Sequence, residues 1–185
     1  MLGKGLGGLV VLALAATAWA QDQGSSNAAP PEPTPAKWSA ADLAKTPAQV
    51  VEAAPKGTLK NPYIDTNADI VAQGGKLFLQ FSCNGCHGGN GGGGICPPLI
   101  NDVWVYGGDD DTLFRLVTLG SVELQAKGYF RKGMENVVAP MPPFGALIPN
   151  ADSLWKILTW VRSSYKGSPS YKYGSPMDAP PPENE

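Results

Sequence analysis

The chain has 185 residues, with 14 basic and 16 acidic side chains and a formal net charge of -2. Because it carries no basic stripe, the composition excludes a polycation that binds nucleic acid. The length suits one domain with tails, and the clustering of the 23 glycines and 18 prolines predicts flexible ends around a compact middle. The single histidine excludes any site that needs two imidazoles.

The first 20 residues have the pattern of an export signal. Lys4 supplies a weak positive charge, an apolar run follows over Leu6 to Ala16, and Ala18-Trp19-Ala20 fits a small-x-small cleavage site. The apolar run is short for a bilayer span, so we expect cleavage before Gln21, a periplasmic protein and no stable membrane insertion. An uncleaved anchor is the alternative.

The rest of the chain divides by composition. Residues 21–36 form a Pro- and Ala-rich linker that cannot bury enough surface to fold. Residues 37–66 form an N-terminal extension, with one small helix and a turn at Asn61-Pro62-Tyr63. A compact domain is expected over residues 67–165, followed by a Pro/Gly-rich tail over 166–185.

The compact domain is predicted to be mostly α-helical. The first helix has one apolar face with spacings of three and four residues, formed by Ile70, Gly74, Leu77, Phe78 and Phe81. A second helix should follow the capping run Asp109-Asp110-Asp111 and end at Gly120. A third should begin near Asn150 and carry an apolar stripe to Tyr165, and residues 103–106 are a weak strand candidate.

Long irregular segments, residues 88–94 and 139–149, join these helices. A domain of under about 100 residues with three helices and this much irregular chain lacks the apolar area for a robust core. We therefore expect a bulky cofactor inside the domain.

A short motif identifies the cofactor. Cys83-Asn84-Gly85-Cys86-His87 is a C-x-x-C-H sequence, the pattern of covalent haem c attachment. Each thiol can add to one haem vinyl group, and His87 is then held under the iron as its proximal ligand. The motif occurs once, so we predict one haem c.

Three other interpretations of the cysteines remain. A Cys3His zinc site would combine the motif with Cys96, but adjacent Cys and His rarely bind the same metal. A redox dithiol would need a β-α-β context, and a structural disulfide would leave His87 without a role. With both motif thiols used by haem, we expect Cys96 to be a small buried hydrophobe, with an intermolecular disulfide as the alternative.

The sixth iron ligand cannot be histidine, because the chain has no second one. Met141 lies in a loop stiffened by Pro140, Pro142 and Pro143, and a rigid loop can hold a thioether on iron. We predict Met141 as this ligand. Met134, in a polar run, is the alternative ligand, and Met141 as core filler is the other possibility.

The order of these motifs resembles that of a class I bacterial cytochrome c over residues 67–165. The resemblance rests on the first helix, Cys83 to His87, Pro97-Pro98-Leu99, Met141-Pro142-Pro143-Phe144 and the helix with Trp155 and Trp160. It implies a cytochrome c domain there, with the class I cytochrome c fold, in which helices and loops surround one covalently bound haem.

The resemblance also implies roles for individual residues. The Pro97 carbonyl would accept a hydrogen bond from His87 Nδ1–H and fix the ring. Leu99 would pack on the porphyrin, and Trp104 or Arg115 could contact a propionate. Where the terminal helices cross, Gly74 and Phe78 would meet Trp160.

A narrower resemblance involves Leu59-Lys60-Asn61-Pro62-Tyr63 and the segment from Leu99 to Tyr106. Both segments are similar to those of the cytochrome cL family. Its members are the periplasmic electron acceptors of PQQ-dependent methanol and related alcohol dehydrogenases. The Met-Pro-Pro-Phe loop and the insert from Ser121 to Val138 depart from that pattern. The resemblance therefore implies the general role and leaves the particular dehydrogenase and its alcohol open.

These observations predict a periplasmic electron carrier rather than an enzyme. A PQQ-dependent dehydrogenase is the expected donor, and another cytochrome or an oxidase the expected acceptor. The alternatives are a cytochrome subunit of a larger oxidoreductase complex, and a haem sensor or enzyme with an open sixth position. If Asp102 or Asp109 to Asp111 lie near the haem edge, we expect a partner with a basic patch; an apolar contact around Tyr129 and Phe130 is the alternative.

Overall fold

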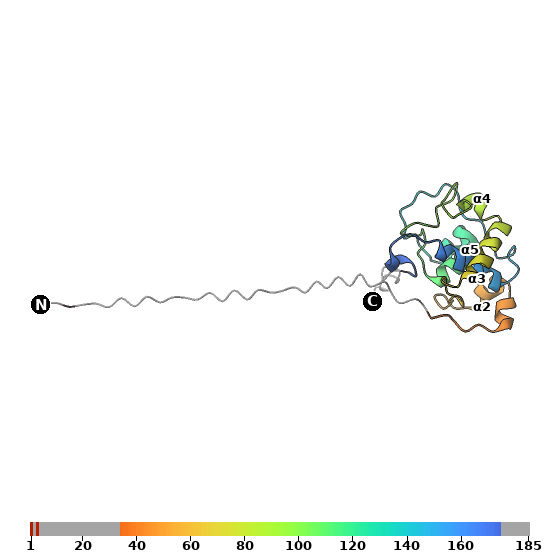
Figure 1. Ribbon diagram of the computed structural model, residues 1–185, viewed down its shortest axis with the longest axis horizontal. Helices are drawn as coiled ribbons and strands as arrows, with labels where there is room; N and C mark the ends of the chain where they lie inside the picture. The colour runs from red at the N-terminus through yellow and green to blue at the C-terminus, as the bar shows by residue number, and fades with distance from the viewer. Residues whose placement is uncertain (2, 4–33, 175–185) are drawn as a thin grey trace.

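The computed structural model describes residues 34–174, together with Met1 and Gly3 (Figure 1). The predicted export signal, most of the linker and residues 175–185 of the tail lie outside the described residues. Within the described part, no helix has both the length and the apolar character that a membrane crossing needs.

The described chain is helical and contains no β-strand, which confirms the predicted mostly α class. Figure 1 shows α2 and α4 at opposite ends of the domain, with α3 and α5 between them. The helices are α1 (Ala40–Ala44), α2 (Pro47–Ala53), α3 (Ala68–Gln80), α4 (Asn84–His87), α5 (Asp110–Ala126), α6 (Ala151–Ser163) and the 3-10 turn η1 (Pro169–Tyr171).

Two local predictions were wrong. The strand candidate at residues 103–106 forms a bend and a turn: Gly107 N–H donates to the Trp104 carbonyl at 2.9 Å, and the Val105 carbonyl accepts from Lys132 and Gly133 N–H. The extension folds into two short helices rather than one. Thr46 starts the second of them, since it forms a capping box with Gln49 and is followed by Pro47 at the first helical position.

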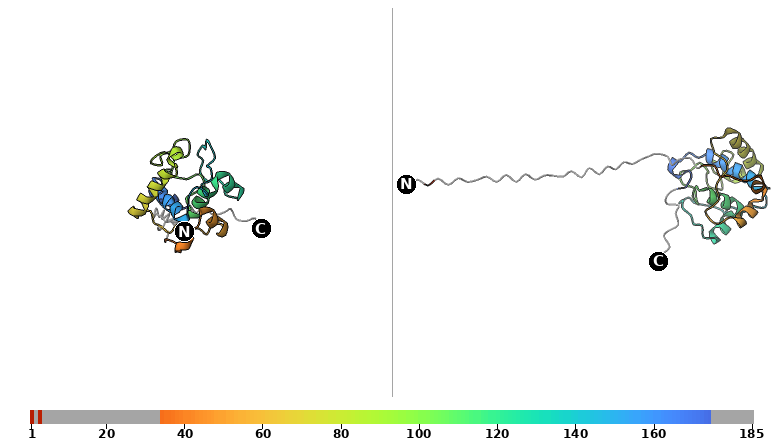
Figure 2. Two further views of the ribbon diagram at one scale, coloured as in Figure 1. Left: turned by 90° about the vertical axis from the view of Figure 1, so that its right-hand side faces the viewer. Right: turned by 90° about the horizontal axis from the view of Figure 1, so that it is seen from below.

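Helices α3 and α6 lie side by side, as Figures 1 and 2 show from several directions. The close approach depends on Gly74, because a Cβ atom there would lie 2.0 Å from the Lys156 carbonyl oxygen. One turn further on, the Phe78 and Trp160 rings pack with centroids 4.3 Å apart. The predicted meeting of Gly74 and Phe78 with Trp160 is therefore present.

The centre of the core is Trp155 on α6, whose side chain is fully buried. Phe114 of α5 packs against its ring at 4.4 Å between centroids, and Trp38 of the extension meets it edge-on at 5.7 Å. The Trp38 indole N–H also donates to the Lys60 carbonyl at 2.9 Å. The N-terminal extension is thus part of the core and not an appendage.

The N-terminus of α5 is the other attachment point of the extension. Asp109 caps the helix, as predicted, by accepting from Thr112 N–H at 2.8 Å. The next two carboxylates are buried in ion pairs, Asp110 with Arg162 and Asp111 with Arg115. They also accept backbone N–H groups of the extension, Leu59 on Asp111 and Asn61 on Asp110.

These contacts change the acidity of Asp111. Burial alone would raise its pKa, but hydrogen bonds from Arg115 and Tyr129 hold the pKa of this carboxyl below its usual value. Asp111 is therefore ionised at neutral pH. The ion pair stabilises the fold above the pKa of an unfolded Asp, and this contribution is lost as the pH falls through the folded value.

Replacing Gly74 by Ala should destabilise the domain by about 1–3 kcal/mol, because the added methyl group forces α3 away from the α6 backbone. Urea unfolding followed by circular dichroism measures the change. Gly92→Ala is the matched control, since a Cβ at Gly92 has nothing within 4 Å. Equal stability of the two variants would contradict this account of the helix contact.

Candidate functional site

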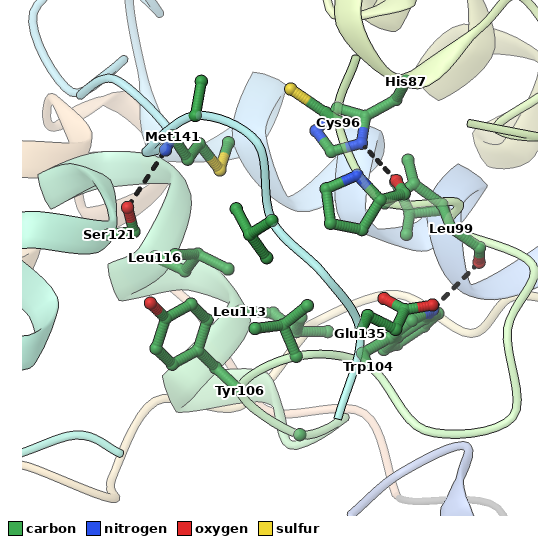
Figure 3. Close-up of a pocket in the computed structure, with 16 residues that line it drawn as sticks. His87, Cys96, Leu99, Trp104, Tyr106, Leu113, Leu116, Ser121, Glu135 and Met141 are labelled. Carbon is green, nitrogen blue, oxygen red and sulfur yellow. Dashed lines mark hydrogen bonds between the residues drawn. The ribbon is translucent and has the colours of Figure 1, made fainter. Parts of the chain in front are cut away.

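An apolar cavity lies between α4, α5 and the loops before and after α5 (Figure 3). Most of its lining is aliphatic or aromatic, including Leu113, Leu116 and Val161. Five of the eight residues predicted for the site line it, namely His87, Pro97, Leu99, Trp104 and Met141. Figure 3 shows His87 and Met141 on facing sides of this space.

The His87 ring is held in one orientation. Its Nδ1 lies 2.8 Å from the Pro97 carbonyl oxygen, as expected from the sequence. Because a carbonyl only accepts, Nδ1 carries the proton, and the Nε2 lone pair is available to a metal. Burial lowers the pKa of His87, and the hydrogen bond to Pro97 opposes this only in part, so the ring favours the neutral form that can ligate.

Met141 is held by a break in α5. At Gly120 the helix has φ 76 and ψ 166, so the chain turns there before it continues to Ala126. The predicted helix end at Gly120 is thus a kink, and the predicted insert begins as a second half of the helix. Ser121 N–H donates to the Met141 carbonyl, and Met141 N–H donates to Ser121 Oγ, each at 3.0 Å.

The break requires glycine for two reasons. A positive φ is strained for residues with a Cβ, and a Cβ at Gly120 would lie 2.7 Å from the Met141 carbonyl oxygen. Two further bonds hold the loop on α5, from Phe144 N–H to the Val117 carbonyl and from Gly145 N–H to the Thr118 carbonyl. The methionine loop is therefore fixed by α5 as well as stiffened by its prolines.

Met134, the alternative ligand, lies away from this arrangement. Its side chain is 98% exposed and does not line the cavity. The assignment of Met141 as the iron ligand remains a prediction, but of these two methionines only Met141 faces the same space as His87.

The two residues predicted to contact a propionate differ in position. Trp104 lines the cavity, with its indole N–H donating to the Leu99 carbonyl at 2.9 Å. Arg115 does not line it, which corrects the prediction. Its guanidinium lies beneath the extension, where it donates to Asp111 and to the carbonyls of Val51, Ala54 and Pro55.

Residues that sequence reasoning missed also belong to the site. Ser121 is the first residue of the predicted insert, and its position as a polar residue directly after a helix-breaking glycine is the signal that could have identified it. Glu135 comes from the same insert, and its carboxyl group lines the cavity. Its Oε2 is buried without a hydrogen-bond partner among the described residues, and burial raises the pKa of this group.

The cysteines differ from the prediction. Cys86 forms a disulfide with Cys96, with 5.0 Å between their Cα atoms, while Cys83 is a free thiol. The glycine-rich loop turns the chain back, so that Cys96 N–H donates to the Cys86 carbonyl at 3.1 Å. Cys96 is buried as expected, at 6% exposure, but it is bonded within the chain. Burial raises the pKa of the Cys83 thiol to about 11.

The donor set fits a haem c. An imidazole and a thioether line one apolar cavity, and Cys83 offers a free thiol beside α4. Since one sulfur cannot form both bonds, a thioether at Cys86 requires the disulfide to be reduced first. The cavity encloses about 90 Å³, less than a porphyrin fills, so its lining would have to open for a haem to bind.

The zinc alternative finds no support in the described residues, which contain no group of three or more His, Cys, Asp or Glu side chains arranged for a metal. The structural-disulfide alternative is present in this structure, because Cys86 pairs with Cys96.

The disulfide predicts a labelling pattern for the haem-free chain. Iodoacetamide added in denaturant without reductant should label Cys83 alone, and after reduction it should label all three cysteines. In Cys96→Ser, two thiols should be labelled before reduction. Peptide mass spectrometry reads the positions, and a label on Cys96 before reduction would contradict the pairing.

Comparison with known proteins gives two matches. The family described as cytochrome c oxidase, cbb3-type, subunit III, matches residues 69–161, a range that includes all eight predicted site residues. The cbb3-type cytochrome c oxidase subunit CcoP of Azospirillum brasilense is 38% identical over 57 residues, 27% of this chain and 19% of that relative. The match thus spans under a fifth of the relative's length, and no solved structure matches the chain.

Proposed function

Since the chain belongs to the family of cytochrome c oxidase, cbb3-type, subunit III, and is thereby an electron-carrying c-type cytochrome with covalently bound haem, we propose that it holds one haem between His87 and Met141. We further propose that it carries single electrons in the bacterial periplasm. The observation that carries the proposal is the placement of His87 and Met141 on facing sides of one apolar cavity.

The chain's own residues position the ligands and keep the site dry. The Pro97 carbonyl fixes the His87 ring, and Ser121 fixes the backbone of Met141. Leu113 and Leu116 line the cavity from α5 and exclude water. Bound haem would supply a one-electron iron couple, and a thioether ligand from Met141 would favour its ferrous form and raise the potential.

A carrier function, rather than catalysis, follows from the proposed ligands. His87 and Met141 would hold the haem iron together, which would leave no free iron site for a substrate or a gas. The Met141 loop is held to α5 by four hydrogen bonds, which favours a ligand that stays in place during the redox cycle. We therefore propose that the protein forms and breaks no substrate bonds.

The resemblance of residues 59–63 and 99–106 to cytochrome cL supports a PQQ-dependent alcohol dehydrogenase as the electron donor. Another cytochrome or an oxidase would then be the acceptor. The family match and the relative CcoP support a second candidate, in which the chain is a stable subunit of a larger oxidase complex.

Substitution of the methionines tests the ligand. We expect a low-spin spectrum whose weak far-red band, a mark of sulfur ligation in the oxidised protein, is lost in Met141→Ala and kept in Met134→Ala. The exposed Met134 is the matched control. The reverse pattern would identify Met134 as the ligand, and ready binding of carbon monoxide by the unsubstituted protein would favour the sensor or enzyme alternative.

Purification and a donor assay distinguish the two candidate roles. We expect the oxidised protein to be isolated alone, to carry one haem that acid-acetone does not extract, and to be reduced by a PQQ-dependent alcohol dehydrogenase with its alcohol. Visible absorbance follows the reduction. Isolation only together with oxidase subunits, with no reduction by the dehydrogenase, would favour the subunit role.

A further inference from the structure

A second cavity lies on the outer side of Tyr106, where the extension meets the two ends of α5. It is a groove of about 490 Å³, and three lysines line it: Lys56, Lys60 and Lys132. We propose that this lysine groove is the docking surface for a redox partner whose contact face is acidic. The inference rests on the proposed electron-carrier function and adds the place and charge of its encounter.

The walls of the groove are fixed before any partner arrives. The Lys56 ammonium group lies 4.1 Å from the Tyr129 ring centroid and donates to the Gly128 carbonyl at 3.0 Å. Tyr129 in turn donates to Asp111 at 2.7 Å. Phe130, which is 49% exposed, adds an apolar part to the same groove, and a preformed, mixed surface of this kind suits a brief redox encounter.

The local charge is opposite to that of the chain. Asp109 and Asp111 are the acidic residues of the groove lining, but the Asp111 carboxylate is paired with Arg115. Lys56 and Lys60 then outnumber Asp109, so the part of the groove that they line is positive in a chain whose net charge is -2. An acidic face is complementary to it, and such complementarity steers association and fixes orientation.

The proposed partner differs from the basic one expected if Asp102 or Asp109 to Asp111 lie near the haem edge. Of these, Asp110 and Asp111 are buried in ion pairs with arginines. The lysines that replace them come largely from the N-terminal extension. Lys56 and Lys60 precede residues 69–161, so this part of the surface is not part of the matched family domain.

The groove is also next to the proposed haem site. Tyr106 lines both the groove and the cavity of His87 and Met141. A partner seated in the groove would therefore be separated from the haem cavity by the layer of chain that contains Tyr106. Contact and electron transfer can then occur at one place.

Electron transfer to small ions tests whether electrons leave the protein at the positively charged lysine groove. The reduced holoprotein is mixed with hexacyanoferrate(III) at low ionic strength, and the rate is compared with that of the Lys56→Gln/Lys60→Gln variant. We expect a fall of about tenfold, and no fall with the cationic tris(phenanthroline)cobalt(III). Lys76→Gln/Lys166→Gln is the matched control, since both lysines are exposed and neither lines the groove.

A second measurement does not depend on electron transfer. Hexacyanochromate(III), a paramagnetic and redox-inert anion, should broaden the amide signals of Gly57, Lys60 and Tyr129 in the unsubstituted protein and not in the groove variant. Unchanged haem spectra show that each variant is folded.

The outcomes separate the two proposals. Equal rate losses in the groove and control variants, or broadening elsewhere on the surface, would overturn the docking surface while the carrier function stands. A holoprotein that exchanges electrons with neither reagent would overturn the carrier function, and broadening confined to the groove would then show an anion-binding surface without a redox role.

Discussion

The break of α5 at Gly120 is the constraint on which the rest of the site depends. Before the break, the helix holds the extension through Asp110 and Asp111. At the break, the free backbone of Ser121 pairs with Met141. In a continuous helix, the Ser121 N–H would bond to a carbonyl of the preceding turn. The methionine loop would then lack the hydrogen bond from Ser121 N–H to the Met141 carbonyl. Helix α5 thus contacts the extension with its first half and the loop of the proposed ligand at its break.

Local chemistry made much of the fold predictable. The caps of Asn150 and Asp109 depend on short-range patterns that a sequence displays directly. The meeting of Gly74 with Trp160 and the His87 to Pro97 bond were predicted through the resemblance to class I cytochromes c. The sequence predicts that the helix ends at Gly120. The second half of the helix, which continues to Ala126 after the kink, depends on packing against the rest of the domain.

The remaining features arise from contacts between distant segments. Arg115 has the right charge for a propionate, but the folded extension surrounds it with carbonyl groups from residues more than 50 positions away. The same burial removes Asp111 from the surface and leaves the lysines to set the local charge. Such outcomes depend on which segment covers which helix, and periodicity and motifs do not contain that information.

The disulfide is adjacent to both partners of the hydrogen bond that orients the proposed proximal ligand. Cys86 directly precedes His87, and Cys96 directly precedes Pro97. The disulfide therefore joins the two sides of the loop next to the imidazole and the carbonyl that accepts its hydrogen bond. It therefore holds His87 Nδ1 near the Pro97 carbonyl in a chain that has not yet received its haem. A haem held by a thioether at Cys86 and by the His87 imidazole would also restrain this ring. The oxidised loop thus holds the imidazole and its acceptor together, and a thiol reductant would have to reduce the disulfide to two thiols before Cys86 could form a thioether.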